Sequence, residues 1–315
     1  MEIDKLYWRM IKMVLYFAKI NLESHIYDVY DNKIALKKAL DTIMQTFKSG
    51  GKYEKEEFFK DGADLNVQKI VYKVHITEKE EEYIAGYIYK DSKIRYKVFD
   101  ENKEEMKSRI VDSNEVVNFY FDVYHERVGY NTANRFGYRE FLEAFKGILN
   151  ACLSVDENQF RFSVGLCMEG ATLNEITDEL KQISNIQRLK FKYKAPNPDT
   201  KELRAIQNDA EDTLNQLKDA NIATKSVIFT AAKVIGINVE AEEIQEQLRE
   251  ANNLHSEIDS IKAMKNGYVE IEAIDSHGNK HISGEEKAIK KEISKIEEFV
   301  EACKNVIRNR CLRNE

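Results

Sequence analysis

The chain contains few of the residues that interrupt regular secondary structure. Its 315 residues include 13 glycines and only 2 prolines, Pro196 and Pro198. Proline breaks helices and sheet ladders, and glycine is typical of turns and loops. Such low counts argue against irregular linkers and low-complexity segments. The sequence therefore predicts long helices and few irregular linkers.

Cysteine is also scarce, and its spacing forms no recognisable site. The four cysteines are Cys152, Cys167, Cys303 and Cys311, and no two of them form a CxxC pair. A disulfide framework is unusual in a chain of this length. We therefore expect a protein of the reducing cytoplasm.

The sequence has no long uncharged hydrophobic run. The apolar stretch near the N-terminus is interrupted by Arg9, Lys12 and Lys19, and no small-residue cleavage site follows it. These charges exclude a membrane span or a signal peptide at this place. We expect the stretch to be a core element, and we expect no membrane insertion.

The motifs of common enzyme classes are missing. The chain has no GxxxxGK[ST] phosphate loop, no GxGxxG after a strand, no HExxH and no GxSxG. Three weaker groupings remain and, among 55 acidic residues, such matches arise by chance. We interpret them as surface residues, assign no catalytic residue, metal or cofactor, and keep a metal-dependent nuclease as an alternative. The groupings are Asp64 with Gln68 and Lys69, Glu270 with Glu272 and Asp275, and Asp275 with His277 and His281.

What the chain does contain is a balanced mixture of apolar and charged residues. Hydrophobic residues make up 43% and charged residues 33%, which is typical of a globular protein. The formal net charge is −7. This value excludes a surface that is basic throughout, but it leaves local basic patches open because a field depends on where charges lie.

Periodicity predicts an α+β protein in two parts. We expect an N-terminal part, 1–197, with a mixed sheet and packed helices, and a helix-rich part, 198–315, with a β-hairpin at 267–284 and a long C-terminal helix. The predicted helices are 31–48, 135–153, 172–183, 199–220, 239–264 and 285–312. The predicted strands are 67–76, 82–90, 93–99, 116–124, 160–168 and 188–194.

Some connections are predicted as well. We expect a polar loop over 50–64, a short turn at Asp91-Ser92 between two strands, and a polar segment over 100–109 that leads to the strand 116–124. The pattern of segment 160–194 predicts a strand, a helix and a second strand. This order is compatible with parallel pairing of the two strands.

The segment RLKFKYK, 188–194, places a cation at every second position. Side chains alternate between the faces of a strand, so Leu189, Phe191 and Tyr193 are expected to face the core. The opposite face then presents a positive row that suits a polyanion. Two alternatives stay open: an ordinary solvated strand face, or a row covered by the acidic helix around 240–259. The row consists of Arg188, Lys190, Lys192 and Lys194.

Two further groups of cations are candidate nucleic-acid contacts. Segment 125–140 contains Arg127, Arg135 and Arg139 among residues that hydrogen-bond and stack on nucleotides. The C-terminal segment contains Arg308 and Arg310. The simpler interpretation is a polar strand-to-helix connection for the first group and a favourable interaction with the helix dipole for the second.

Three segments together carry a family resemblance, over roughly residues 114 to 300. VVNFYFDVYHERVGYN, LKFKYKAPNPD and GYVEIEAIDSHGNKHISGEEK occur in an order that resembles the RexA-like phage-exclusion family and related bacterial defence-associated proteins. The resemblance implies a two-part α+β homodimer that binds DNA with little sequence preference. It also implies that Arg188, Lys190, Lys192 and Lys194 are DNA-facing.

We therefore predict a non-catalytic, dimeric, nucleic-acid-binding protein of bacterial antiphage defence. The alternative is an interaction or regulatory subunit that docks onto a partner defence protein.

Overall fold

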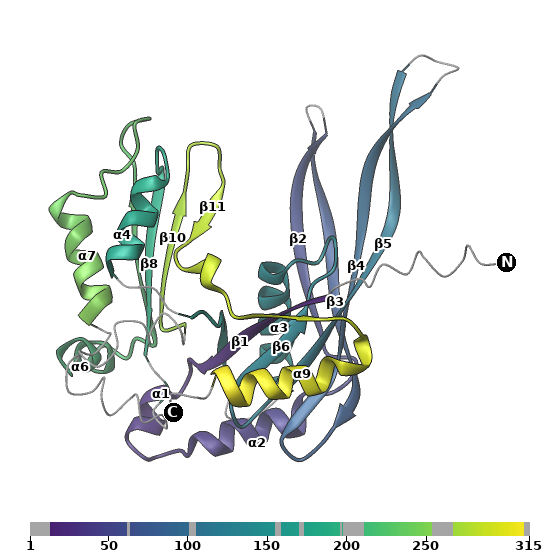
Figure 1. Cartoon of the computed structure of the whole chain (residues 1–315), viewed down its shortest axis with the longest axis horizontal. Helices are drawn as coiled ribbons and strands as arrows, with labels where there is room; N and C mark the ends of the chain where they lie inside the picture. Colours follow the sequence, from purple (N-terminus) through teal and green to yellow (C-terminus); the bar gives the residue numbers. More distant parts are fainter. Residues whose placement is uncertain are drawn as a thin grey trace.

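Two antiparallel β-sheets organise the chain (Figure 1). The computed structural model describes residues 13–61, 64–100, 105–154, 159–169, 173–195, 197, 211–253 and 267–311. Among the described residues, those in strands outnumber those in helices, 42% against 31%. The predicted α+β organisation with a helix-rich C-terminal part is therefore wrong: the protein is β-rich, and its helices are short.

The first sheet has eight strands and is strongly curled. Its order is β12-β1-β6-β5-β4-β3-β2, and β7 and β12 lie end to end along one edge of β1. Its strands are β1 (Met13–Leu22), β2 (Lys52–Asp61), β3 (Asp64–Lys79), β4 (Tyr83–Asp100), β5 (Glu105–Asp122), β6 (Arg127–Asn131), β7 (Phe162–Leu166) and β12 (Lys290–Ile293).

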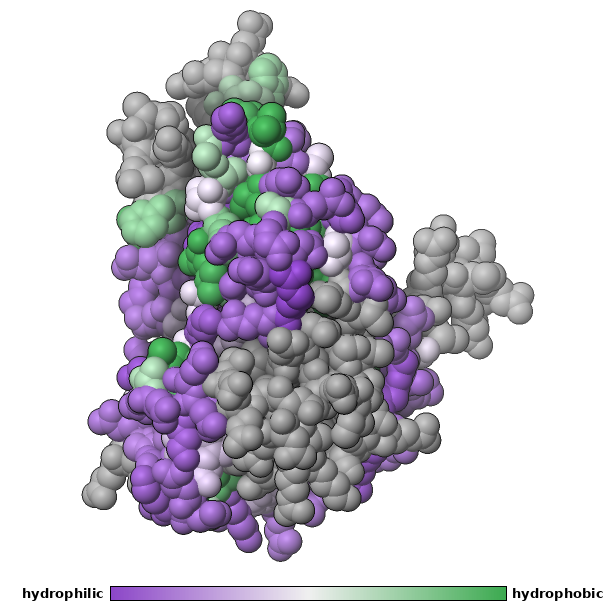
Figure 2. Space-filling model, turned by 90° about the vertical axis from the view of Figure 1, so that its left-hand side faces the viewer, coloured by the Kyte–Doolittle hydropathy of each residue, from purple (hydrophilic) through white to green (hydrophobic). Residues whose placement is uncertain are grey.

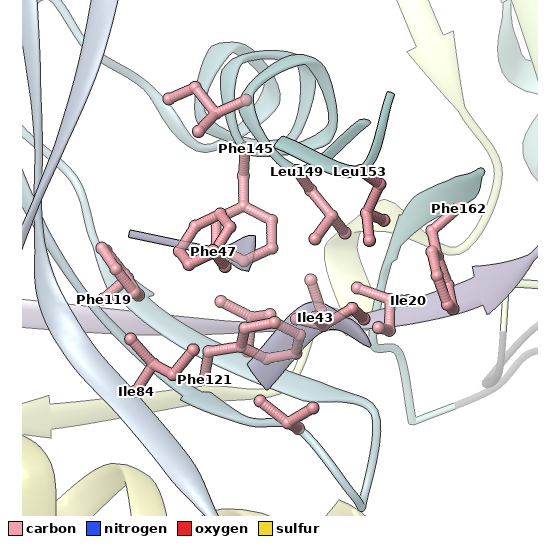
Figure 3. Close-up of a cluster of buried hydrophobic side chains, with 14 of the residues drawn as sticks. Ile20, Ile43, Phe47, Ile84, Phe119, Phe121, Phe145, Leu149, Leu153 and Phe162 are labelled. Carbon is pink, nitrogen blue, oxygen red and sulfur yellow. The ribbon is translucent and has the colours of Figure 1, made fainter. Parts of the chain in front are cut away.

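The helices α2 (Leu36–Thr46) and α3 (Tyr138–Leu153) cover one face of this sheet. Their apolar stripes meet aromatic residues of β5, with Phe47 edge-on to Phe119 and Phe121 (Figure 3). Phe145 and Leu149 of α3 are fully buried in the same cluster. This core holds α2 and α3 against the body of the first sheet. The far ends of the β2–β3 and β4–β5 hairpins lie outside it.

The helix α9 (Phe299–Val306) covers the opposite face and continues as a π-helical turn, η3 (Ile307–Cys311). It packs on Leu15 and Phe17, which alternate along β1 with residues that face α2 and α3. Gly129 of β6 lies against α9, because a Cβ at that position would meet the Cys303 Sγ at 2.6 Å. The close approach explains why a glycine stands in this fully buried strand.

The second sheet has four strands in the order β11-β10-β8-β9. Helices α4 (Leu173–Gln182) and α7 (Glu242–Asn253) pack on its apolar face. Seen from this side, the molecule is mainly hydrophilic where it is described, with apolar side chains in the upper half of the view (Figure 2). The strands of the second sheet are β8 (Arg188–Lys194), β9 (Thr224–Thr230), β10 (Val269–Ile274) and β11 (Lys280–Ile282), and the helices α1 (Ile26–Tyr30) and α6 (Glu211–Asp219) complete this side of the molecule.

The expected long helix over 285–312 is wrong. Residues Glu285–Lys287 form a 3-10 turn, β12 follows, a second 3-10 turn covers Ile296–Glu298, and α9 begins only at Phe299. β12 pairs with the free edge of β1, from Met13↔Ile293 to Tyr16↔Lys290. Tertiary pairing therefore overrides a local pattern of helical period. It also brings the chain after residue 197 back into the first sheet, so that the predicted division at 197 does not follow the sheets.

Three predicted connections in the N-terminal part are also wrong. The polar segment from Lys52 is the edge strand β2, where charged residues are well tolerated. Asp91 and Ser92 form no turn but continue β4, and the buried Ser92 hydroxyl donates to the Ser113 carbonyl at 3.3 Å. The polar segment after residue 104 belongs to β5.

The predicted parallel unit does not form. β7 pairs antiparallel with β1 in the first sheet, whereas β8 lies in the second. The hairpin predicted at 267–284 is confirmed as β10 and β11. The helices predicted at 31–48, 135–153 and 172–183 are confirmed as the shorter α2, α3 and α4.

Parts of two other predicted helices lie outside the described residues. Of 199–220 the structure describes α6, and of 239–264 it describes α7. Within the described ranges, no helix combines the length and the apolar composition needed to cross a membrane.

Candidate nucleic-acid interface

The cationic strand β8 lies in the middle of the second sheet, between β10 and β9. Leu189, Phe191 and Tyr193 are at most 1% exposed and belong to the core under α4 and α7. Lys190 and Lys192 are partly exposed on the other face. The predicted alternation of β8 is therefore confirmed.

The acidic helix α7 packs on the apolar face of β8. The Tyr193 hydroxyl donates to the backbone carbonyl of Gln247 at 3.0 Å. Beside it, Lys225 of β9 forms an ion pair with Glu250 at 2.5 Å. The described part of α7 thus lies on the side opposite to Lys190 and Lys192, and the alternative in which this helix covers the lysine row is wrong for these residues.

Acidic residues of β10 lie beside the lysines. Glu270 is the cross-strand partner of Lys192, and Glu272 is the partner of Lys190. Directly opposite side chains in an antiparallel pair have Cβ atoms about 5 Å apart, so their charges offset one another. Glu272 also pairs with Lys280 of β11, at 2.6 Å. Sequence reasoning did not place these two glutamates beside the lysines, because they lie about 80 residues along the chain from β8.

The neighbour on the other side of β8 carries no acid on this face. Lys190 lies opposite Ile228 of β9, and Lys192 lies opposite Ser226. The exposed Arg188 lies between Thr230 of β9 and Ile274 of β10. The paired residues of this polar face thus include four cations and two acids, a local excess of two positive charges. We call this surface the basic sheet face; its cations are Arg188, Lys190, Lys192 and Lys280, and its acids are Glu270 and Glu272.

A protein-family model covers the chain from α2 to the end of α9. The family, described as a domain of unknown function (DUF4747), matches residues 38–310. The chain belongs to the DUF4747 family. No curated protein matches it. The match includes every strand of the second sheet, so the basic sheet face lies inside the DUF4747 region.

The last cation of the predicted row is not on the surface of this DUF4747 protein. Lys194 is only 3% exposed, close to Gly165 of β7 and Gly267 before β10. Burial disfavours the charged form and lowers the pKa of Lys194 to about 8, with Lys192 adding a smaller effect in the same direction. The row therefore ends at Lys192, and Lys194 has to be removed from the set of accessible candidates.

Arg127 is buried as well, at 1% exposure, where the two sheets meet. It stands in β6 between Lys19 of β1 and Asp122 of β5. The Lys19 ammonium donates to the Tyr268 hydroxyl at 3.0 Å, which ties the first sheet to the chain just before β10. Arg127 is thus a structural residue of this junction. Contrary to the prediction, it is not accessible to nucleic acid.

The other predicted arginines lie on separate surfaces. Arg139 of α3 pairs with Glu285, Arg308 with Glu82 at 3.4 Å, and Arg310 with Glu169. The exposed Arg135 contributes its backbone carbonyl to the Lys90 ammonium at 2.7 Å. None of these contacts joins β8, so the structure does not bring the nine predicted residues together into one site.

The weaker carboxylate groupings serve local contacts. Asp275 accepts backbone N–H groups from His277 and Asn279 and lies 3.2 Å from the His281 ring nitrogen, so it organises the turn between β10 and β11. Lys69 pairs with Glu54, and Gln68 donates to a backbone carbonyl of β4. Among the described residues, no group of three or more metal-ligating side chains converges.

Proposed function

We propose that this protein binds nucleic acid through the basic sheet face, with little preference for sequence. The observation that carries the proposal is the alignment of Arg188, Lys190 and Lys192 at alternate positions of one central strand. Like-facing residues of a strand lie about 6.6 Å apart, which is comparable with the spacing of phosphates along a nucleic-acid strand. Contacts of this kind add affinity without reading bases.

The net charge of the chain limits how strongly the basic sheet face attracts nucleic acid from a distance. The whole chain has a net charge of −7, so long-range attraction of a polyanion is weak. Binding then depends on close contacts with the local excess of cations, and it is expected to be modest and strongly weakened by salt.

The wider biological setting is part of the same proposal. The RexA-like resemblance supports DNA as the ligand, a homodimer as the assembly and antiphage defence as the role. The three described cysteines Cys152, Cys167 and Cys303 are free, which supports the reducing cytoplasm as the location.

Fluorescence anisotropy with labelled single-stranded and duplex DNA at low salt tests the ligand. The informative variant is Lys190→Glu/Lys192→Glu, which reverses the charge of the two central lysines. It should lower the affinity by at least about tenfold, because two phosphate contacts are lost and two repulsions are introduced.

The matched control is Lys37→Glu/Lys295→Glu, which makes the same change in net charge at exposed positions on α2 and before α9. It should leave the affinity within about twofold of that of the unmodified protein. Equal losses in both variants, or no binding at low salt, would overturn the proposal. Light scattering of the unmodified chain tests the dimer separately.

A further inference from the structure

Two β-hairpins leave the first sheet as separate arms. β3 pairs with β4 only between Val71↔Asp91 and Lys79↔Ile84. Beyond this point β3 stays paired with β2, and β4 stays paired with β5, as far as Asp61↔Asp64 and Asp100↔Glu105. Figure 1 shows the two hairpins running away from the body on either side of a gap.

One side-chain contact bridges the hairpins where their backbone pairing ends. The Gln68 Nε2 of β3 donates to the Lys93 carbonyl of β4 at 2.7 Å. From Ser92 to Asp100, no strand among the described residues pairs with the edge of β4 that faces β3. An edge of this kind presents backbone N–H and C=O groups that can pair with another extended chain.

Exposed apolar side chains gather on the same two hairpins. The described residues include fourteen large hydrophobic side chains that are exposed, and eight of them are on β2 to β5. Such a concentration on one part of a surface is typical of an interaction site. The eight are Phe58, Val67, Tyr96, Phe99, Met106, Ile110, Val111 and Val116.

The two faces of the β4 arm differ in chemistry. Ile94, Tyr96 and Val98 point to one face, because they occupy alternate positions of the strand. Lys93, Lys97 and Phe99 point to the other face and are exposed. A strand added to this edge would therefore meet only apolar neighbours on one side, and two lysines and one phenylalanine on the other.

The arm is a poor match for nucleic acid. Segment 92–112 contains six lysines and arginines and five acidic residues. Its net charge of +1 offers little for a polyanion, whereas its apolar side chains need apolar partners. A protein ligand fits this surface better.

We propose that the free edge of β4 between Ser92 and Asp100 binds an extended segment of a partner protein by strand addition. The segment takes up the unpaired backbone groups of β4. Its side chains alternate between apolar residues, beside Ile94, Tyr96 and Val98, and acidic residues, beside Lys93 and Lys97. This site is separate from the basic sheet face and does not depend on nucleic-acid binding.

A displayed library of random peptides, selected on the purified full chain, tests the site without knowledge of the partner. Peptides of roughly twelve residues are long enough to span the free edge. Selected sequences should alternate apolar and acidic residues and bind with dissociation constants below about 100 μM. Absence of binders, or binders without the alternation, overturns the proposal.

Backbone methylation then distinguishes strand addition from other modes of binding. N-methyl groups at every second amide on one edge of a selected peptide should abolish binding, and the alternate set should be tolerated, since only one edge of the peptide faces β4. Equal tolerance of both sets contradicts strand addition.

Substitutions in β4 test whether the selected peptides bind at this edge. Tyr96→Lys and Lys97→Glu should each lower the affinity by about tenfold, whereas Val234→Lys, at an 80% exposed apolar residue outside the arms, should not change it. Light scattering tests whether a second copy of the chain occupies the edge instead. If the chain is a dimer and Tyr96→Lys converts it to a monomer, the edge binds a second copy. The proposal of a different partner protein is then wrong.

Discussion

Lys190 of β8 lies directly opposite Glu272 of β10, and Glu272 is at the same time 2.6 Å from the ammonium of Lys280. One carboxylate thus pairs with Lys280 and lies beside Lys190, on a sheet face that has more cations than acids. Its removal would raise the positive charge of the face without touching the proposed ligand contacts themselves.

Glu272→Gln is therefore expected to strengthen nucleic-acid binding. Glutamine keeps the shape of the side chain and removes the negative charge next to Lys190 and Lys280. We expect the affinity at low salt to rise by about threefold to tenfold, measured by anisotropy. The same substitution at Glu297, an exposed position in the turn before α9, serves as the control. A weaker complex after Glu272→Gln would contradict the role assigned to this face.

Buried Lys194 is expected to make stability depend on pH. Its pKa is lowered to about 8 in the folded protein, whereas in the unfolded chain it stays near the ordinary value for lysine. Between these two values the unfolded state binds more protons, so the contribution of Lys194 to the free energy of unfolding rises with pH. Below about pH 8, Lys194 is destabilising by on the order of 3 kcal/mol.

Lys194→Met removes this effect and keeps most of the side-chain volume. Urea unfolding should find the variant more stable than the parent at about pH 7, and the difference should narrow by about 2 kcal/mol at about pH 9.5. Lys37→Met, at an exposed position of α2, should change stability little at either pH. A difference that stays constant with pH, or a less stable Lys194→Met variant, would argue against a buried, desolvated lysine.

The Tyr268 hydroxyl is expected to stabilise the junction between the two sheets. It accepts hydrogen bonds from the Lys19 ammonium at 3.0 Å and from the Asn197 backbone N–H at 3.3 Å, and all three residues are at most 1% exposed. Tyr268→Phe should lower the free energy of unfolding by about 2–3 kcal/mol, because two buried donors lose this acceptor.

Tyr27→Phe is the matched control. Its hydroxyl donates to the Ile222 carbonyl at 2.6 Å in a solvent-exposed contact, so its loss should cost only about 1 kcal/mol. If chemical denaturation gave the same loss for both variants, the Tyr268 contact would not be the stronger one.

Gly129→Ala tests the packing of α9 on the first sheet. The added methyl group would meet the Cys303 Sγ at 2.6 Å and the Phe17 ring at 3.1 Å. Overpacking should destabilise the protein by about 1–3 kcal/mol, and Cys303→Ala in the same chain should recover part of this loss. Gly137→Ser is the control, since a Cβ there meets nothing within 4 Å and serine is favoured at a helix N-cap. Independent effects of Gly129→Ala and Cys303→Ala would contradict the contact.

Features that depend on residues close together in the sequence were predicted correctly from local patterns. The alternation of β8 is visible because side chains of a strand repeat every two residues, and α2 and α3 are visible because their apolar residues repeat at helical period. The turn between β10 and β11 was also predictable, since Asp275 and Gly278 are typical turn residues.

Features that depend on distant partners were not predictable in this way. The segment from Glu285 to Glu298 has helical spacing, yet β12 forms because β1 offers it a free edge. Glu270 and Glu272 reach β8 only through sheet pairing, and the burial of Lys194 depends on Gly165 of another sheet. The charges of the basic sheet face could therefore be counted only once the strand order was known.

The salt dependence of nucleic-acid binding tests the central claim most directly. The logarithm of the affinity for DNA is measured against the logarithm of salt concentration for the unmodified chain and for Arg188→Gln/Lys190→Gln/Lys192→Gln. The account predicts a steep negative slope that becomes shallower by about 2 to 3 in the triple variant, because each lost phosphate contact contributes about 0.7 to 0.9. A slope that is the same in both proteins would contradict it.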